Sequence, residues 1–267
     1  MSAINLSRLR TQLELILPNL EDLEQFLKGL REIYTFYADY THPVGNPPSG
    51  VFTLEEFNTP VILNREVLLL LNPACKETPD HMLALADRLW QEPQVEFRQL
   101  AAQILGKLPE SKADAVLARI RDWSEASPNL ELLPFLHRQA SASIRRNFPE
   151  KWLDLLSEWD ASAQPSLSRL AIEGVLPLID DRDYENLPAI FTFLTPLFIQ
   201  PGSERQYDLL TVLEHLARRS EAETVHFLQK AVELSSDPSM ARFIRRSLAF
   251  FTSTNQEYLK EILRNHA

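Results

Sequence analysis

The chain has 267 residues, of which 45% are hydrophobic and 24% charged, and this composition is typical of a globular protein with a substantial core. Its formal net charge of -10 disfavours indiscriminate phosphate binding, because such binding depends on counterion release by Lys and Arg. Eighteen prolines stand beside only six glycines. This ratio disfavours Gly-rich phosphate loops and β-hairpins, and it favours helices separated by turns that contain proline.

The sequence gives no sign of an oxidising compartment or a membrane. Cys75 is the single cysteine, so an intramolecular disulfide is excluded. Charged and polar residues interrupt the apolar ones throughout residues 1–20, unlike the unbroken apolar region of a signal peptide. No apolar run approaches the roughly 20 residues that a membrane-spanning helix needs. We therefore expect a cytoplasmic protein without a membrane partner.

Two amphipathic helices are predicted at the start of the chain. The first covers residues 5–17 and ends at Pro18, and Asn19 is placed to cap the second, which extends to about residue 40. The segment that follows, residues 41–52 (THPVGNPPSGVF), combines three prolines with two glycines. We expect this segment to be a mobile loop.

Pairs of amphipathic helices are predicted from residue 59 onward. Thr59 and Pro60 form an N-cap followed by an N1 proline, and the helix that they open is expected to end at Asn72 and Pro73. The clearest pair surrounds a Glu-Pro turn within residues 88–109, where apolar residues recur at helical spacing. The later pairs are predicted at 111–127 with 129–147, 149–160 with 165–180, 183–199 with 203–219, and 221–235 with 238–252, followed by a last helix at 255–265.

The first helices of successive pairs begin every 32 to 38 residues, and a period of this length indicates stacked helical repeats. We therefore predict an all-α fold, a right-handed α-α superhelix of the HEAT or armadillo type. The whole chain, 1–267, is expected to form one domain, with N-terminal helices and the mobile loop at 1–58, helix pairs at 59–252 and a capping helix at 253–267. An irregular all-α bundle is the alternative.

Motifs for metal, cofactor or nucleophilic chemistry are not found in the sequence. None of the six histidines lies in an HExxH motif or a Cys/His cluster, and Walker, GxGxxG and GxSxG motifs are missing. We expect neither a metal nor a cofactor. The acidic residues Asp180, Asp181 and Asp183 are expected at a helix start, where carboxylates stabilise the helix dipole.

Arginines outnumber lysines twenty to seven, and many fall on the second helix of a pair. Second helices usually line the concave face of a helical solenoid, so Arg138, Arg169 and Arg242 could bind phosphate there. The alternative is that the arginines form salt bridges between helices. The helix dipole offers a third explanation for some of the arginines. Arg145 and Arg146 fall near a helix C-terminus, where a cation is favoured.

The hairpin around Trp90 resembles the HEAT-like alkylpurine DNA glycosylases of the DNA alkylation repair family. The resemblance is carried by Leu89, Trp90, Pro93, Glu96, Phe97, Ala101, Ala102, Ile104 and Lys107, which match the pattern LW..P..EF...AA..I..K. It extends more weakly over residues 59–230, through Thr59, Pro60 and Arg65, Trp123, the helices at 153–159 and 167–172, and residues 213–229.

The resemblance implies a cleft that holds duplex DNA and hydrolysis of the N-glycosidic bond of cationic alkylated purines. In the family an aspartate stabilises the developing positive charge on the sugar, tryptophans surround the deoxyribose, and arginines hold phosphates. Such an anion stabilises an oxocarbenium-like transition state. This chain departs from the pattern, because the catalytic aspartate corresponds to Pro134 and one cleft tryptophan to Leu130.

Two further cleft positions are replaced in the second half of the chain. The other cleft tryptophan corresponds to Val212 and a phosphate-binding arginine to His215, whereas Arg169 matches the family. Glu131 is a weak candidate for a displaced catalytic carboxylate. We therefore expect a HEAT-like module that lacks glycosylase activity and binds a protein or nucleic acid in a cleft lined by Leu130, Pro134, Arg169, Val212 and His215. The alternative is an alkylpurine DNA glycosylase or DNA repair protein of altered specificity.

Overall fold

The computed structural model describes residues 5–39, 54–126, 130–162 and 164–266. The chain packs as two compact units, unit 1 over residues 1–147 and unit 2 over residues 148–267. The described residues form α-helices and short 3-10 helices, with one isolated β-bridge between Glu55 and Gln94. The loop predicted over residues 41–52 lies outside the described residues.

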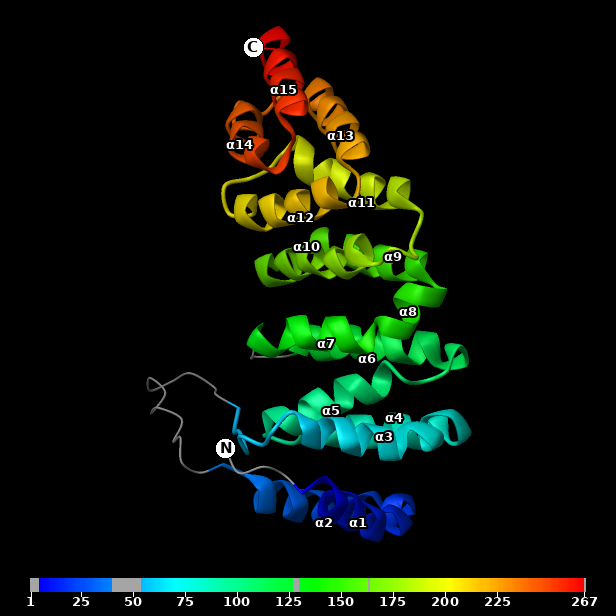
Figure 1. Cartoon of the computed structure of the whole chain (residues 1–267). Coiled ribbons are helices and arrows are strands. Elements are labelled where there is room, and N and C mark those ends of the chain that lie inside the picture. The colour runs from blue at the N-terminus through cyan, green and yellow to red at the C-terminus, as the bar shows by residue number, and fades with distance from the viewer. Residues whose placement is uncertain (1–4, 40–53, 127–129, 163, 267) are drawn as a thin grey trace. The chain divides into compact units, whose positions relative to one another are not determined.

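Unit 1 contains eight of the α-helices that the structure describes, and its helices are arranged in two layers. α1, α3, α5 and α7 contact one another in that order, and α2 contacts α4 beside them (Figure 1). The bounds are α1 Leu6–Ile16, η1 Leu17–Glu21, α2 Leu23–Tyr37, α3 Ile62–Glu77, α4 Pro79–Gln91, α5 Val95–Leu105, η2 Glu110–Lys112, α6 Ala113–Ala126, η3 Leu130–Leu132, α7 Leu133–Ala140 and α8 Ala142–Asn147.

Unit 2 repeats the two-layer arrangement. α9, α11, α13 and α15 contact one another in order, and α10, α12 and α14 form the second layer. The bounds are α9 Pro149–Asp160, α10 Pro165–Asp180, α11 Leu187–Ile199, α12 Gln206–Arg219, α13 Glu221–Leu234, α14 Met240–Ser247, η4 Leu248–Phe250 and α15 Ser253–Asn265. Each amphipathic helix buries its apolar stripe against the helices before and after it, so the predicted all-α fold of stacked helix pairs is confirmed.

The hairpin at Trp90 packs between helices, as its amphipathic pattern predicts. The indole of Trp90 on α4 stacks on that of Trp123 on α6, with ring centroids 4.4 Å apart, and the Arg98 guanidinium lies over the Trp90 ring at 5.4 Å. Phe97 is fully buried, and its ring contacts Tyr34 from α2 at 5.0 Å. These side chains hold the helices of unit 1 together.

Several helix boundaries differ from the prediction, among them those of α2 and α3. α2 is capped by Asp22, whose carboxylate accepts hydrogen bonds from the backbone of residues 24 and 25, while Asn19 lies in η1. α3 begins at Ile62 and continues through Pro73 to Glu77. Leu71 and Cys75 on either side of Pro73 are fully buried, and their burial favours continuation of the helix despite the missing backbone N–H.

The helix predicted over residues 129–147 is divided into η3, α7 and α8, with a break at Ser141. The Ser141 hydroxyl donates to the carbonyl of His137, and the Arg145 guanidinium donates to the carbonyls of His137 and Arg138. The carbonyl of His137 also accepts the backbone N–H of Ser141, and the side-chain bonds add to this cap at the end of α7. Capping from a residue downstream therefore permits a break that the hydrophobic pattern does not reveal.

Gly106, the residue that follows α5, lies against the backbone of α7. A Cβ atom at this position would overlap the backbone carbonyl oxygen of Gln139 on α7. The glycine has an ordinary helical φ of -68°, so the requirement is for space and not for backbone freedom.

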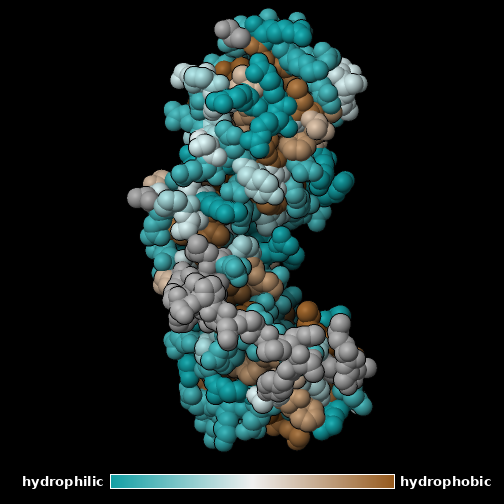
Figure 2. Space-filling view, turned by 90° about the vertical axis from the view of Figure 1, so that its left-hand side faces the viewer, coloured by the Kyte–Doolittle hydropathy of each residue, from teal (hydrophilic) through white to brown (hydrophobic). Residues whose placement is uncertain are grey.

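Hydrophilic residues cover much of the face seen in Figure 2, and hydrophobic residues appear there in separate patches. Some large apolar side chains are exposed on the described helices, among them Phe36 on α2, Leu69 on α3 and Leu234 on α13. The most exposed of these three is Leu234, at 63%. Singly exposed apolar residues are ordinary, but an exposed one beside a cavity deserves a functional explanation.

Candidate functional site

The predicted residues of unit 2 lie along the seam between α10 and α12, two helices in contact. Arg169 and Glu173 stand one turn apart on α10, and Asp208 and His215 lie two turns apart on α12. Helical spacing therefore gives each helix one row of polar side chains, and the packing of the helices brings the two rows together. We call these two rows of side chains together the α10–α12 surface.

Arg169 shares its charge between two carboxylates. Its Nε lies 3.3 Å from Oε1 of Glu173 and 3.4 Å from Oδ2 of Asp208. The Arg169 side chain is 62% exposed, whereas that of Asp208 is only 9% exposed. Burial raises the pKa of the Asp208 carboxyl, and the positive charge of Arg169 acts in the opposite direction. Arg169 thus helps to keep a buried acid ionised, and this contact limits its freedom to hold a phosphate.

His215 is paired with Asp180, the last residue of α10. The imidazole Nδ1 lies 2.6 Å from Oδ1 of the carboxylate. The prediction that Asp180 to Asp183 open a helix is wrong, because Asp180 ends α10 and α11 begins at Leu187 behind the N-cap Asn186. The carboxylate interacts with a histidine of the next helix pair instead of with a helix N-terminus.

The α10–α12 surface carries more acid than base. Glu173, Asp208 and Asp180 contribute three carboxylates, against the guanidinium of Arg169 and the imidazole of His215. Neighbouring arginines are also engaged. Arg205 binds Asp160 at 2.9 Å, Arg218 binds Glu214, and Arg219 donates to the carbonyls of Arg182 and Tyr184. Salt bridges and capping bonds therefore account for these arginines.

Val212 lies on α12 between Asp208 and His215, and its side chain is fully buried. It contributes packing beneath the α10–α12 surface and no exposed contact area. Arg242 lies on α14, where it is exposed. Hydrogen bonds from Ser239 are the main cause that lowers the pKa of Asp237, and the charge of Arg242 adds a smaller part. Arg242 and Arg169 thus lie on different helices of the second layer, Arg242 on α14 and Arg169 on α10.

The predicted residues of unit 1 lie at the start of α7. Leu130 and Glu131 belong to η3, Pro134 is in the first turn of α7, and Arg138 follows one turn later. Glu131, Pro134 and Arg138 are exposed, while the Leu130 side chain lies outside the described part of the molecule. Pro134 fixes the backbone of the first turn and offers neither a charge nor a backbone N–H.

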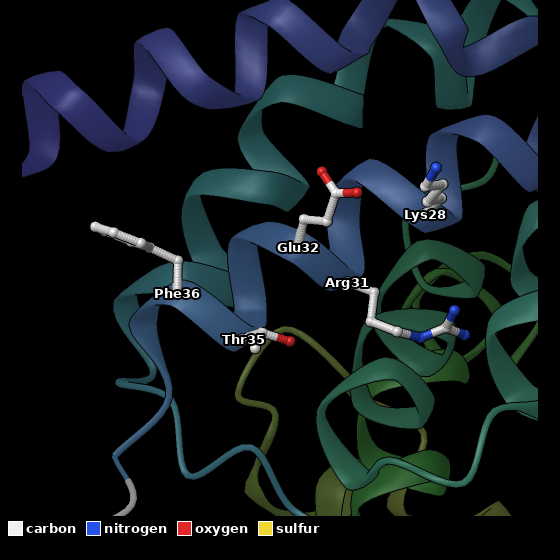
Figure 3. A pocket seen from close by; sticks show the side chains of 5 residues that line it. All are labelled: Lys28, Arg31, Glu32, Thr35 and Phe36. Carbon is white, nitrogen blue, oxygen red and sulfur yellow. The ribbon is translucent and has the colours of Figure 1, made fainter.

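A second candidate surface, which the sequence analysis missed, lies on α2. Lys28, Arg31, Glu32, Thr35 and Phe36 line a cavity of about 520 Å³ (Figure 3). Arg31 reaches Glu92 at 2.5 Å, and the Phe36 ring is 54% exposed. An aromatic residue on the otherwise polar face of this helix is the signal that could have revealed it.

Candidates for metal or nucleophile chemistry are weak in the described residues. No group of three or more His, Cys, Asp or Glu in this part of the chain is placed to hold a metal ion. Cys75 is buried, and burial raises the pKa of its thiol to about 11, so it stays protonated and unreactive at neutral pH. Ser124 and His137 are hydrogen-bonded at 2.8 Å, but both are buried in unit 1. Among the described residues, no helix is long and apolar enough to cross a membrane.

The sequence profile of a family described as DNA alkylation repair enzyme matches residues 64–247. The matched region is more than half of the chain and includes the Trp90 hairpin, the start of α7 and the α10–α12 surface. No curated protein and no solved structure gave a significant match. The family profile agrees with the resemblance carried by the Trp90 hairpin, and the chain therefore belongs to the DNA alkylation repair enzyme family.

Proposed function

We propose that this chain is a HEAT-like binding module of the family that has no glycosylase activity and binds a protein partner through its α10–α12 surface. The observation that carries the proposal is the sharing of the Arg169 charge between Glu173 and Asp208. A phosphate would have to compete with both carboxylates for one guanidinium. A partner with positively charged groups would meet the carboxylates of Glu173 and Asp180, which are 30% and 58% exposed.

The residues at the start of α7 support the absence of catalysis. By the resemblance, the catalytic aspartate of the family would correspond to Pro134, and a proline cannot stabilise a developing cation. Glu131 is the acidic residue nearest to it in the chain, three positions earlier. The Glu131 carboxylate, which lies in η3, would have to replace an aspartate that the family pattern has at a position in the first turn of α7.

The activity is tested by incubating the full chain with alkylated duplex DNA and measuring the release of methylated purine. We expect no release above the rate of the protein-free reaction. A release that disappears in Glu131→Gln would overturn the proposal and identify Glu131 as a displaced catalytic acid. Glu261→Gln, an exposed acid on α15, is the matched control, because it removes one charge far along the sequence from α7.

Nucleic-acid binding is tested with a fluorescent duplex at low and moderate salt. We expect no measurable binding by the native chain. Affinity that falls with salt and with Arg169→Ala, but is retained in the exposed control Arg264→Ala, would favour DNA as the ligand instead of a protein. The double variant Glu173→Gln, Asp208→Asn frees Arg169 from both carboxylates, and we expect it to bind the duplex more tightly than the native chain does.

A further inference from the structure

A groove between α11 and α13 in unit 2 has an apolar floor. Its volume is about 570 Å³. The rings of Phe191 and Phe227 stack along it with centroids 4.9 Å apart, and Ala231 and Leu234 continue the floor toward the end of α13. Leu234 is 63% exposed at that end. The floor is thus an apolar strip in which Leu234 is exposed, Phe191 is half-buried, and Phe227 and Ala231 are buried.

The interior of the groove offers no free hydroxyl donor. The hydroxyl of Thr192 donates to the carbonyl of Pro188 at 2.9 Å, and that of Thr195 donates to the carbonyl of Phe191 at 2.7 Å. Pockets for small molecules usually orient their ligand with a few polar groups placed inside. Here the hydroxyls are already used by their own helix, so the interior supplies apolar contact alone.

The charged groups lie along one edge of the groove. Glu223, His226 and Lys230 are exposed and line it in that order along α13. Within the described residues, neither Glu223 nor Lys230 forms an ion pair. A negative group and a positive group therefore stand two turns apart on the same side, about 10 Å from each other along the helix axis.

The groove is elongated along α13. Its lining residues on this helix extend from Ala222 to Leu234, a rise of about 18 Å. An apolar floor of this length with charges at its edge matches the surface of an amphipathic helix, which buries an apolar stripe and keeps its charged residues at the margin. A compact small molecule would leave part of the strip uncovered.

We propose that the α11–α13 groove binds an amphipathic helix of a partner protein. The apolar stripe of this helix lies on Phe191, Phe227 and Leu234, a basic residue faces Glu223, and an acidic residue faces Lys230. The helix runs antiparallel to α13, with its acidic residue two turns before its basic one, because this direction opposes the two helix dipoles and places each charge favourably on its own helix. The proposal concerns other helices than the α10–α12 surface and stands without the proposed function.

The test uses two fluorescein-labelled peptides of about 18 residues, a length at which partial helix formation is expected. Both carry leucines at helical spacing, with Glu seven positions before Lys in the first and the two charges exchanged in the second. Fluorescence anisotropy with the full chain should show that the first peptide binds about tenfold more tightly. It matches both charges in the antiparallel direction, whereas the second peptide can match them only in the parallel direction, in which the two helix dipoles repel each other. Equal affinities, or no binding of either peptide, would overturn the proposal.

Variants of the protein make the test specific to the groove. The double variant Glu223→Lys, Lys230→Glu keeps the composition of charges and should invert the preference between the peptides. Leu234→Asp should abolish binding of both, whereas Leu69→Asp, at a leucine of α3 with 56% exposure, should leave it unchanged. An unchanged preference in the double variant would show that the peptides bind elsewhere. Melting curves confirm that each variant is folded.

Discussion

His137 on α7 is a buried histidine whose protonation opposes folding. Burial lowers the pKa of its imidazole to about 3, below the value of about 6.5 expected in an unfolded chain. Between these values the unfolded state binds a proton that the folded state does not. The contribution of His137 to stability is therefore complete above pH 6.5 and falls as the pH decreases toward 3.

We expect this residue to lower the free energy of unfolding by about 1.4 kcal/mol for each pH unit well below pH 6.5. Urea unfolding of the native chain and of His137→Gln, measured at pH 7 and pH 5, checks the prediction. The variant should lose less stability between the two pH values than the native chain, and the exposed His226→Gln should behave like the native chain. Parallel losses in His137→Gln and the native chain would contradict it.

Gly106 is predicted to tolerate no side chain. Gly106→Ala forces α5 and α7 apart, since the new Cβ overlaps the carbonyl oxygen of Gln139, and we expect a loss of about 1–3 kcal/mol in the free energy of unfolding. The matched variant is Gly202→Ala, where an added Cβ meets nothing within 4 Å, and its stability should be equal or slightly higher. Thermal melting of both variants shows the contrast, and equal melting temperatures would contradict the prediction.

At the level of single residues, the sequence predicts on which helix a side chain lies better than it predicts which side chains it contacts. It places Arg169 and His215 on the second helices of their pairs. It does not indicate that Asp208 and Asp180 are the acids that they meet, because such ion pairs depend on the register at which α10 packs on α12. Hydrophobic periodicity fixes the buried face of each helix, but it does not fix this register to within one side chain.

Among the helices, α15 shows how one element is capped by another. Its N-cap residue Thr252 makes no side-chain capping bond of its own. Instead, Oε1 of Glu221 on α13 accepts hydrogen bonds from the backbone and hydroxyl of Thr252 and from the amide of Asn255. These bonds lower the pKa of Glu221, so their contribution to stability is present at neutral pH and is lost as the pH falls through the lowered value.

We expect Glu221→Ala to loosen the first turn of α15, at a cost of about 0.5–2 kcal/mol, the usual range for a lost helix cap. Hydrogen exchange measured by mass spectrometry should be faster in residues 253–257 of the variant. The control is Glu261→Ala on the exposed side of α15, which should leave this segment protected. An unchanged exchange rate in Glu221→Ala would contradict the prediction, because it would show that water replaces the hydrogen bonds of Glu221 without loss of stability.

The existence and order of the helices could be predicted from the sequence, but some of their boundaries could not. Prolines illustrate the reason, because Pro149 and Pro165 open helices as expected, whereas Pro73 lies inside α3. A proline starts a helix through its own backbone geometry, a local property. Whether a helix continues through one depends on how well the flanking residues are buried, and burial is a property of the tertiary structure.

For the molecule as a whole, the division into two units predicts that a destabilising mutation in one unit leaves the other unit unaffected. Unit 1 and unit 2 each bury their own apolar residues. Gly106→Ala should therefore speed hydrogen exchange in α5 and α7 while leaving α10 and α12 as protected as in the native chain. An equal loss of protection in both pairs of helices would show that the two units unfold as one.

The four tryptophans of the chain fall into two pairs, one in each unit. Trp90 and Trp123 lie almost parallel, with an interplanar angle of 5°, whereas Trp152 and Trp159 meet edge to face at 81° with centroids 6.3 Å apart. Neighbouring indoles couple electronically in a manner that depends on their mutual orientation, so the two pairs should give distinct signals in near-ultraviolet circular dichroism. The chain therefore contains two intrinsic optical reporters, and Trp90→Phe removes the coupled signal of unit 1 while that of unit 2 remains.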